Sequence, residues 1–328
     1  YGSVAADPLV AERAALKRRL LALRDGKRVE VGAGKDRVII PASVDDLAAA
    51  YEAEPGATIV AGATDVGLWV TKFMRDLGPL IFVSHLSELH RIEEGGTALK
   101  LGASVSYNEA TAALVKRYPQ MEQFWSRIGG EQVRNMGTIG GNIANGSPIG
   151  DMPPALIALD ARVTLRSLEG VREFPLEAFF IDYGKQDRQR HEFVESISVP
   201  TLPEDAQFAV YKITKRRDED ITAVLGAFYL RLDGDNSVAE IRLAYGGMAG
   251  IPKRAANVES ALLGNNWTEA NVKAAAAELA TDFSPLSDWR ASADYRLLAA
   301  RNLLTRFYLK SQGEEAELVR FAAAGGRS

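Results

Sequence analysis

Two short glycine-rich runs have the residue types and the spacing of an anion-binding site. The first reads Ala61-Gly62-Ala63-Thr64-Asp65-Val66-Gly67, the second reads Gly137-Thr138-Ile139-Gly140-Gly141-Asn142, and each follows an apolar stretch. Glycine leaves backbone N–H groups uncovered and permits positive φ, so a segment of glycines, hydroxyls and amides can wrap a diphosphate without a lysine. We expect the two runs to form opposite walls of one site, completed by Ser147-Pro148-Ile149-Gly150-Asp151.

Neither run matches a common phosphate-binding fingerprint. The first lacks the Gly-Lys-Ser/Thr ending of a P-loop, and neither contains G-x-G-x-x-G. Taken alone, each run is more typical of an ordinary turn between a strand and a helix. Their combination favours the binding-site interpretation.

Composition and charge limit the classes of function. The chain has 328 residues, of which 47% are hydrophobic and 25% charged, enough for two or three packed units. Its net charge of −4 argues against a nucleic-acid surface. No apolar run reaches the roughly 18 residues of a membrane span and we recognise no signal peptide, so we expect a cytoplasmic protein that binds neither nucleic acid nor membrane.

The cysteine and histidine content predicts no metal on this chain. The sequence has no cysteine, which excludes iron–sulfur clusters and zinc sites ligated by thiolates. The three histidines, His85, His90 and His191, have no metal-ligand spacing. Any one-electron chemistry at such a centre must therefore lie on another domain or chain.

Hydrophobic patterning predicts the elements that position the glycine runs. Residues 9–23 indicate an amphipathic helix, either a linker or a helix packed on the body. Ser43 and Asp46 form the pattern of a capping box that opens a helix over residues 44–54. Flanking strands are expected at residues 38–41 and 58–61, the second leading into the first glycine run.

The middle and the end of the chain differ in pattern. The middle predicts strands near 81–83, 99–103, 162–166 and 193–199, with helices over 107–118 (a capping box of Ser106 and Glu109), 122–129 and 154–159, and with the second glycine run as a loop. The end predicts strands at 208–214, 223–232 and 238–245 with a hairpin turn at 233–235, then helices at 253–263, 268–281 and 292–309. Strands followed by helices indicate an α+β unit with its helices on one sheet face.

Four ordered motifs resemble the FAD domain of xanthine dehydrogenase in its bacterial small-subunit form. They are Ala61-Gly62-Ala63-Thr64-Asp65, residues 132–142 (QVRNMGTIGGN), residues 147–151 (SPIGD) and residues 212–221 (KITKRRDEDI), and the similarity extends over about residues 38–309. Related flavoprotein subunits of carbon monoxide dehydrogenase and of aromatic-thioester reductases typically carry AGGHS and GGD at the two glycine runs. The AGATD and GGN found here favour the xanthine dehydrogenase branch.

The resemblance implies an α+β fold. It consists of a vanillyl-alcohol-oxidase (PCMH)-type FAD-binding domain of two α+β subdomains, followed by a small C-terminal α+β domain. The implied boundaries are an N-terminal linker helix at 1–35, the FAD-binding domain at 36–203, a CO dehydrogenase flavoprotein C-terminal-like domain at 207–312 and a tail at 313–328.

The resemblance also implies the residues that hold FAD. One wall of the diphosphate site would be Ile59, Val60, Ala61, Gly62, Ala63, Thr64, Asp65 and Val66, and the other Thr138, Ile139, Gly140, Gly141 and Asn142. Asp151 would accept a ribitol or ribose hydroxyl, Lys212 would lie near the polar edge of the flavin, and Val194 would contact the adenine side. Ile128 stands where some relatives have an aromatic residue. FAD is expected to be non-covalent, because Ala63 and Thr64 replace the histidine found at this loop in some flavoproteins.

A second set of residues is implied for access of NAD+. These are Tyr183 and the charged segment Arg216, Arg217, Asp218, Glu219, Asp220 and Ile221. Plainer interpretations stay open: Asp151 as a helix N-cap, Lys212 as a surface lysine, residues 215–220 as a solvated loop and Tyr183 as a packing residue.

The function implied is that of an electron-outlet subunit. Electrons would arrive from iron–sulfur centres on another domain or chain and leave as hydride to NAD+, while a molybdenum-cofactor large subunit in the same hetero-oligomer oxidises hypoxanthine or xanthine. One alternative is the FAD subunit of a carbon monoxide or aldehyde dehydrogenase or an aromatic-thioester reductase, with another donor or acceptor. A non-catalytic nucleotide-binding module is the other.

Overall fold

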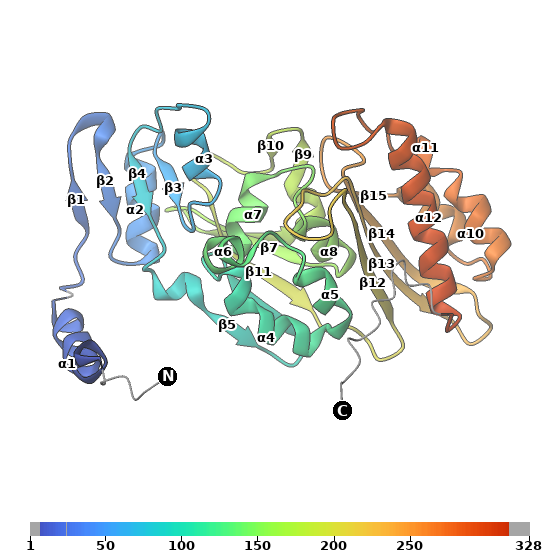
Figure 1. Cartoon of the computed structure of the whole chain (residues 1–328), viewed down its shortest axis with the longest axis horizontal. Coiled ribbons are helices and arrows are strands. Elements are labelled where there is room, and N and C mark those ends of the chain that lie inside the picture. Colours follow the sequence, from blue (N-terminus) through green and yellow to red (C-terminus); the bar gives the residue numbers. More distant parts are fainter. Residues whose placement is uncertain (1–6, 24, 315–328) are drawn as a thin grey trace.

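Three α+β units follow one another along the chain. The computed structural model describes residues 7–23 and 25–314. Figure 1 shows an N-terminal unit (residues 29–91), a middle unit (92–200) and a C-terminal unit (207–311) placed in that order along the long axis. The first two units correspond to the two expected α+β subdomains and the third to the smaller C-terminal one.

The N-terminal unit is a small mixed sheet with one packed helix. Its strands are ordered β1-β2-β4-β3, with β1 and β2 antiparallel and the other pairs parallel. The bounds are β1 Val29–Val31, β2 Val38–Ile40, α2 Val44–Ala53, β3 Thr58–Val60, α3 Val66–Thr71 and β4 Leu80–Phe82. Ser43 caps α2 by accepting a bond from the Asp46 N–H (3.1 Å), as predicted. The Asp46 carboxylate binds Arg28 and the Ala42 N–H instead of closing the box, so the cap is one-sided.

The middle unit is an antiparallel sheet ordered β5-β6-β11-β7-β8, with helices α4 to α8 packed around it. The strands are β5 Ile92–Glu94, β6 Ala98–Gly102, β7 Arg162–Arg166, β8 Val171–Pro175 and β11 Phe193–Pro200, with a hairpin of β9 Phe180–Asp182 and β10 Lys185–Gln186. The helices are α4 Tyr107–Arg117, α5 Glu122–Trp125, α6 Glu131–Met136, α7 Ile139–Asn145 and α8 Met152–Ala158. The Ser106–Glu109 capping box at α4 is confirmed, with both reciprocal bonds formed.

The second glycine run forms a helix, so its prediction as a loop is wrong. Thr138 has extended backbone angles and its hydroxyl accepts a bond from the Gly141 N–H (3.1 Å), which opens α7. Gly140 lets α7 approach Ala103, the residue after β6, because a Cβ at Gly140 would lie 2.6 Å from the Ala103 Cα. Cap and close packing together outweigh the low helix propensity of glycine.

The predicted helix over residues 122–129 is also too long. It ends at Trp125, because the N–H groups of Arg127 and Ile128 donate to carbonyls three residues back instead of four, and the chain then turns at Gly129, which has a φ of +55°. Arg127 and Ile128 therefore lie in a turn between α5 and α6, where they can face other elements.

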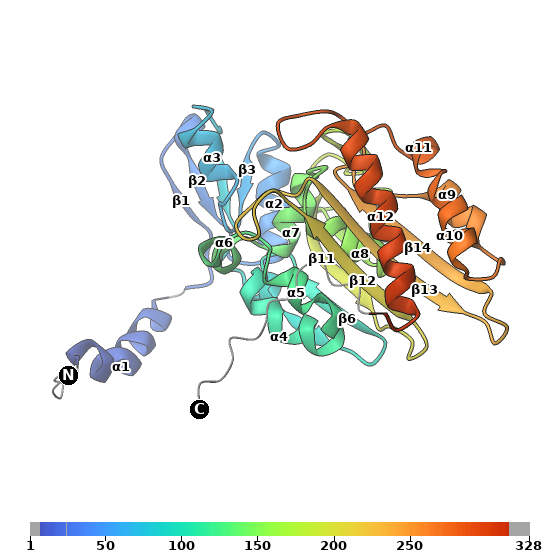
Figure 2. The same cartoon turned by 45° about the vertical axis from the view of Figure 1, so that its right-hand side comes forward.

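The C-terminal unit is an antiparallel sheet with helices on one face, as predicted. Its order is β12-β13-β14-β15, and Figure 2 shows α12 crossing the sheet. The bounds are β12 Gln207–Ile213, β13 Val224–Leu232, β14 Val238–Gly246, β15 Lys253–Arg254, α9 Ala256–Leu262, α10 Glu269–Ala276, α11 Leu279–Asp282 and α12 Ala293–Ser311. Successive residues of β13 face opposite sides: Phe228 packs in the core with α12, while Ala227 packs in the core shared with α8.

Two predicted helices of this unit differ from the structure. Lys253 and Arg254 pair with β14 as a short strand, so the first helix begins only at Ala256. The helix expected over residues 268–281 is divided into α10 and α11. The break lets Asp282, at the end of α11, accept bonds from the N–H groups of Asn257 (3.0 Å) and Val258 (3.1 Å) at the start of α9.

The predicted N-terminal helix is α1, Pro8–Ala22. Asp7 caps it through the Leu9 N–H (2.9 Å), and all of its residues are exposed. Figures 1 and 2 both show it extending away from the three units, so the interpretation as a helix packed on the body is wrong. Apart from Gly313 and Glu314, the expected C-terminal tail lies outside the described residues.

Within residues 7–23 and 25–314, no helix combines the length and the apolar character of a bilayer span.

Candidate functional site

A cleft of about 1050 Å³ contains both glycine runs. Its volume is at the upper end of the roughly 300–1,000 Å³ typical of ligand pockets, so it has room for a dinucleotide. The N-terminal unit contributes β3, the first glycine run and α3, and the middle unit contributes the α6–α7 segment, residues 147–151 and the start of β11. The C-terminal unit contributes Lys212 and residues 219–222.

The first glycine run contacts the residues that flank the second run, within the lining of this cleft. A Cβ at Gly62 would lie 2.5 Å from the carbonyl carbon of Met136, just before the second run, so only glycine permits this approach. The amide of Asn145, at the end of α7, donates to the Asp65 carboxylate over 3.0 Å and joins the first run to the same helix that the second run opens. Partial burial in the cleft wall raises the pKa of the Asp65 carboxyl.

Most of the predicted cofactor residues line the cleft. They are Ile59, Ala61, Gly62, Ala63, Thr64, Asp65, Val66, Ile128, Thr138, Gly140, Gly141, Asn142, Asp151, Val194 and Lys212. Val60 and Ile139 do not, because both side chains are buried in the protein core.

Only some of the residues predicted for NAD+ access line the cleft. Glu219, Asp220 and Ile221 line the cleft, whereas Arg216, Arg217 and Asp218 are exposed outside its lining. Tyr183 is 74% exposed beside the lining residue Gly184, so it is not a buried packing residue.

Lys212 and Asp151 form an ion pair at the wall of the cleft. The Lys212 ammonium lies 2.6 Å from the Asp151 carboxylate and 2.9 Å from the Arg127 carbonyl, and the Thr222 hydroxyl donates to the same carboxylate. The Lys212 side chain is only 2% exposed, so the interpretation as a surface lysine is wrong. Asp151 precedes α8 but makes no capping bond, so the plain N-cap interpretation is wrong as well.

The charged segment after β12 is fixed against the middle unit rather than free. The Arg127 guanidinium donates to the carbonyls of Lys212 (3.0 Å) and Arg217 (3.0 Å) and to the Thr214 hydroxyl (2.9 Å). Burial lowers the pKa of Arg127. Glu219 lies over Gly130, where an added Cβ would be 2.7 Å from its carboxylate oxygen, so this segment covers part of the cleft.

Sequence reasoning missed several lining residues, among them Trp69, Ser104, Tyr107, Gln186 and Arg188. Ser104 is 1% exposed, and neither its hydroxyl nor the Asn142 amide oxygen has a hydrogen-bond partner within the described part of the chain. Buried polar atoms normally have partners. Both lie in the cleft lining: the Asn142 amide oxygen can accept a bond from a ligand hydroxyl, and the Ser104 hydroxyl can donate to a ligand oxygen.

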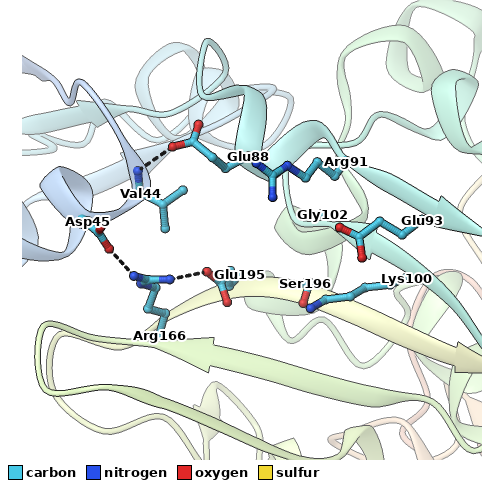
Figure 3. Close-up of a pocket in the computed structure, with 10 residues that line it drawn as sticks. All are labelled: Val44, Asp45, Glu88, Arg91, Glu93, Lys100, Gly102, Arg166, Glu195 and Ser196. Carbon is cyan, nitrogen blue, oxygen red and sulfur yellow. Dashed lines mark hydrogen bonds and ion pairs between the residues drawn. The ribbon is translucent and has the colours of Figure 1, made fainter. Parts of the chain in front are cut away.

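A second, smaller pocket of about 240 Å³ lies between α2 and the sheet of the middle unit. Figure 3 shows Arg166 between Asp45 and Glu195, and the Glu88 carboxylate accepting the Val44 N–H (3.3 Å). Arg166 donates to the carboxylates of Asp45 and Glu195, so its positive charge is already paired within the protein. This pocket connects two units and is a weaker ligand candidate than the cleft.

Comparison with known proteins agrees with this geometry. Residues 30–202 match the family model "FAD binding domain in molybdopterin dehydrogenase", and residues 209–311 match "CO dehydrogenase flavoprotein C-terminal domain". The chain is 36% identical over 227 residues to the glyceraldehyde dehydrogenase medium chain of Sulfolobus acidocaldarius, an alignment covering 68% of this chain and 80% of that one. It is 29% identical over 308 residues to xanthine dehydrogenase/oxidase of Gallus gallus, covering 88% of this chain but only 22% of that protein.

Solved structures show the same fold. A chain of carbon monoxide dehydrogenase from Hydrogenophaga pseudoflava superposes with a TM-score of 0.77 at 29% identity, covering 81% of this chain and 93% of that one. The first family model alone spans more than half of the sequence. The chain therefore belongs to the family of FAD-binding domains of molybdopterin dehydrogenases, and its C-terminal unit is a CO dehydrogenase flavoprotein C-terminal domain.

Proposed function

We propose that this chain is the FAD-carrying electron-outlet subunit of a xanthine dehydrogenase. The observation that carries the proposal is the cleft in which both glycine runs meet, with the buried Lys212–Asp151 pair in its wall. The two unpartnered buried atoms, Ser104 Oγ and Asn142 Oδ1, support a polar ligand there.

The lining residues have distinct parts in holding FAD. The first glycine run supplies backbone N–H groups for the diphosphate. In the second run the N–H groups of residues 139–142 already donate within the protein, so the expectation of uncovered N–H groups there is wrong and this run offers only close backbone approach. Asp151, oriented by Lys212 and Thr222, accepts a hydroxyl, and Lys212 keeps a positive charge at the expected polar edge of the ring. Bound FAD would accept electrons singly and deliver a hydride, which links one-electron carriers to NAD+.

The partners follow from what this chain cannot supply. Because the sequence has no cysteine, the one-electron donor would be an iron–sulfur domain or subunit, and a subunit with the molybdenum cofactor would oxidise the purine. The AGATD and GGN sequences support the xanthine dehydrogenase branch, and Glu219 to Ile221 would face the bound NAD+.

A second candidate is the FAD subunit of an aldehyde dehydrogenase of the same family. It is favoured by the 36% identity to the glyceraldehyde dehydrogenase medium chain. Assays of the complete complex separate the two: xanthine-dependent reduction of NAD+ supports the first, and aldehyde-dependent reduction of a dye without NAD+ reduction supports the second.

The FAD assignment is tested on the purified chain by its visible spectrum and by acid precipitation. We expect a flavin spectrum, or its appearance when FAD is added, and complete release of flavin into the acid supernatant. A colourless chain that takes up no FAD would identify it as a non-catalytic module, and flavin retained in the pellet would refute non-covalent binding.

A further inference from the structure

The cleft has more negative than positive charge in its lining. Of the described residues that line it, Asp65, Asp151, Glu219 and Asp220 are acidic, and Lys212 and Arg188 are basic. With all six groups ionised, four negative and two positive charges leave a formal charge of −2. A dinucleotide carries a negatively charged diphosphate, so a cation in this wall that has no protein partner would offset the repulsion by the acidic residues.

Lys212 is already engaged within the protein. Its ammonium contacts the Asp151 carboxylate at 2.6 Å and the Arg127 carbonyl at 2.9 Å. Arg188 differs, because within the described residues its guanidinium makes no hydrogen bond or ion pair, although it belongs to the cleft lining. Arg188 is therefore the lining cation left available to a ligand.

The backbone on both sides of Arg188 is held firmly. Asp187 donates its N–H to the Phe179 carbonyl (2.8 Å), and its own carbonyl accepts from Arg172 (2.7 Å). On the other side the Gln189 N–H donates to the Glu192 carboxylate (2.6 Å), which also binds Arg172. An unpaired guanidinium is thus presented from a fixed turn, which lowers the entropy lost when it binds a ligand.

We propose that Arg188 binds the diphosphate of a dinucleotide in this cleft. The planar guanidinium donates two parallel hydrogen bonds to phosphate oxygens, and these charge-assisted bonds are the stronger kind. The inference rests on the proposed function. Both the flavin dinucleotide and the nicotinamide dinucleotide contain a diphosphate, and the experiment below distinguishes the two ligands.

The test compares Arg188→Gln with Arg190→Gln in the full chain. Arg190 lies on the same turn and is exposed but outside the cleft lining, so it is a control for the change in charge. Flavin-free protein is titrated with FAD and with riboflavin, which has no phosphate, and FAD-loaded protein is titrated with NAD+. Circular dichroism and thermal unfolding establish that each variant is folded.

We expect Arg188→Gln to weaken FAD binding about tenfold, with riboflavin binding unchanged and a shallower dependence on salt, and Arg190→Gln to match the wild type. Unchanged FAD binding with weakened NAD+ binding would assign Arg188 to the nicotinamide dinucleotide. If both affinities are as in Arg190→Gln, the proposal is wrong. A wild-type chain that binds neither ligand would overturn the proposed function itself, and this is seen before any variant is compared.

Discussion

Gly62 and Gly67 lie five residues apart in the first glycine run, and they should respond in opposite ways to substitution by alanine. A Cβ at Gly62 would lie 2.5 Å from the Met136 carbonyl carbon, whereas a Cβ at Gly67, in α3, has no atom within 4 Å. Non-bonded carbons need about 3.5 Å and the Met136 carbonyl oxygen would be closer still than its carbon, so the Gly62→Ala backbone must move by more than about 1 Å away from the second run.

The magnitudes follow from these two environments. Overpacking of this kind costs about 1–3 kcal/mol of folding free energy, and the opened cleft should bind FAD at least about tenfold more weakly. Gly67→Ala replaces glycine by the best helix former in an open position, so it should stabilise the fold by up to about 1 kcal/mol and leave FAD affinity unchanged. Urea unfolding and FAD titration of both variants measure these effects. Equal stability and equal FAD affinity of the two variants would refute the close contact between the glycine runs.

Three further predictions concern charged groups of the cleft. Lys212→Met leaves Asp151 as a buried charge without its partner, so we expect a loss of about 3–5 kcal/mol in urea unfolding, partly recovered when Asp151 is also replaced by Asn. Glu219→Gln removes an exposed negative charge at the expected nucleotide face, so it should tighten NADH binding about fivefold in a diaphorase assay. The control Asp36→Asn, on the N-terminal unit, should leave NADH binding unchanged. Equal effects of the two changes would mean that the charged segment is not part of the nucleotide site. Because the pKa of Asp65 is raised, the folded state binds the proton of this carboxyl more tightly than the unfolded state does. The stabilising contribution of Asp65 is therefore present below about pH 4 and is lost as pH rises through the folded pKa. Asp65→Asn should therefore raise the melting temperature at pH 7 and not at pH 3.5, and the same gain at both pH values would contradict the burial argument.

Local patterns were enough to predict many elements. The strands β12 and β13 were predicted from apolar-rich runs, and the cap of α4 from two side chains three residues apart. Both signals are contained in short segments. The second glycine run was predicted wrongly because the helical state depends on contacts with Ala103, which is distant in sequence. Propensity alone favours a loop at these glycines.

The candidate site was also only partly predictable from local sequence patterns. The glycine runs were visible as motifs, and the structure brings them into contact through Gly62 and Asn145. Ser104 and Arg188 are single residues without a motif, and they reach the cleft only because β6 and the β10–β11 turn end beside it. The burial of Lys212 likewise depends on packing against Arg127 and Asp151, which no local pattern encodes.

Hydrogen–deuterium exchange of the full chain with and without FAD shows whether the ligand occupies the cleft, because it reports on the backbone N–H groups of the first glycine run, which would hold the diphosphate, and on how well the ligand covers the second run. We expect slower exchange on FAD addition in residues 61–67 and 138–142, and no change in peptides around Glu88 and Arg166 at the smaller pocket. Saturating FAD that leaves both glycine runs unprotected, or that protects the smaller pocket instead, would contradict the assignment of the cleft as the FAD site.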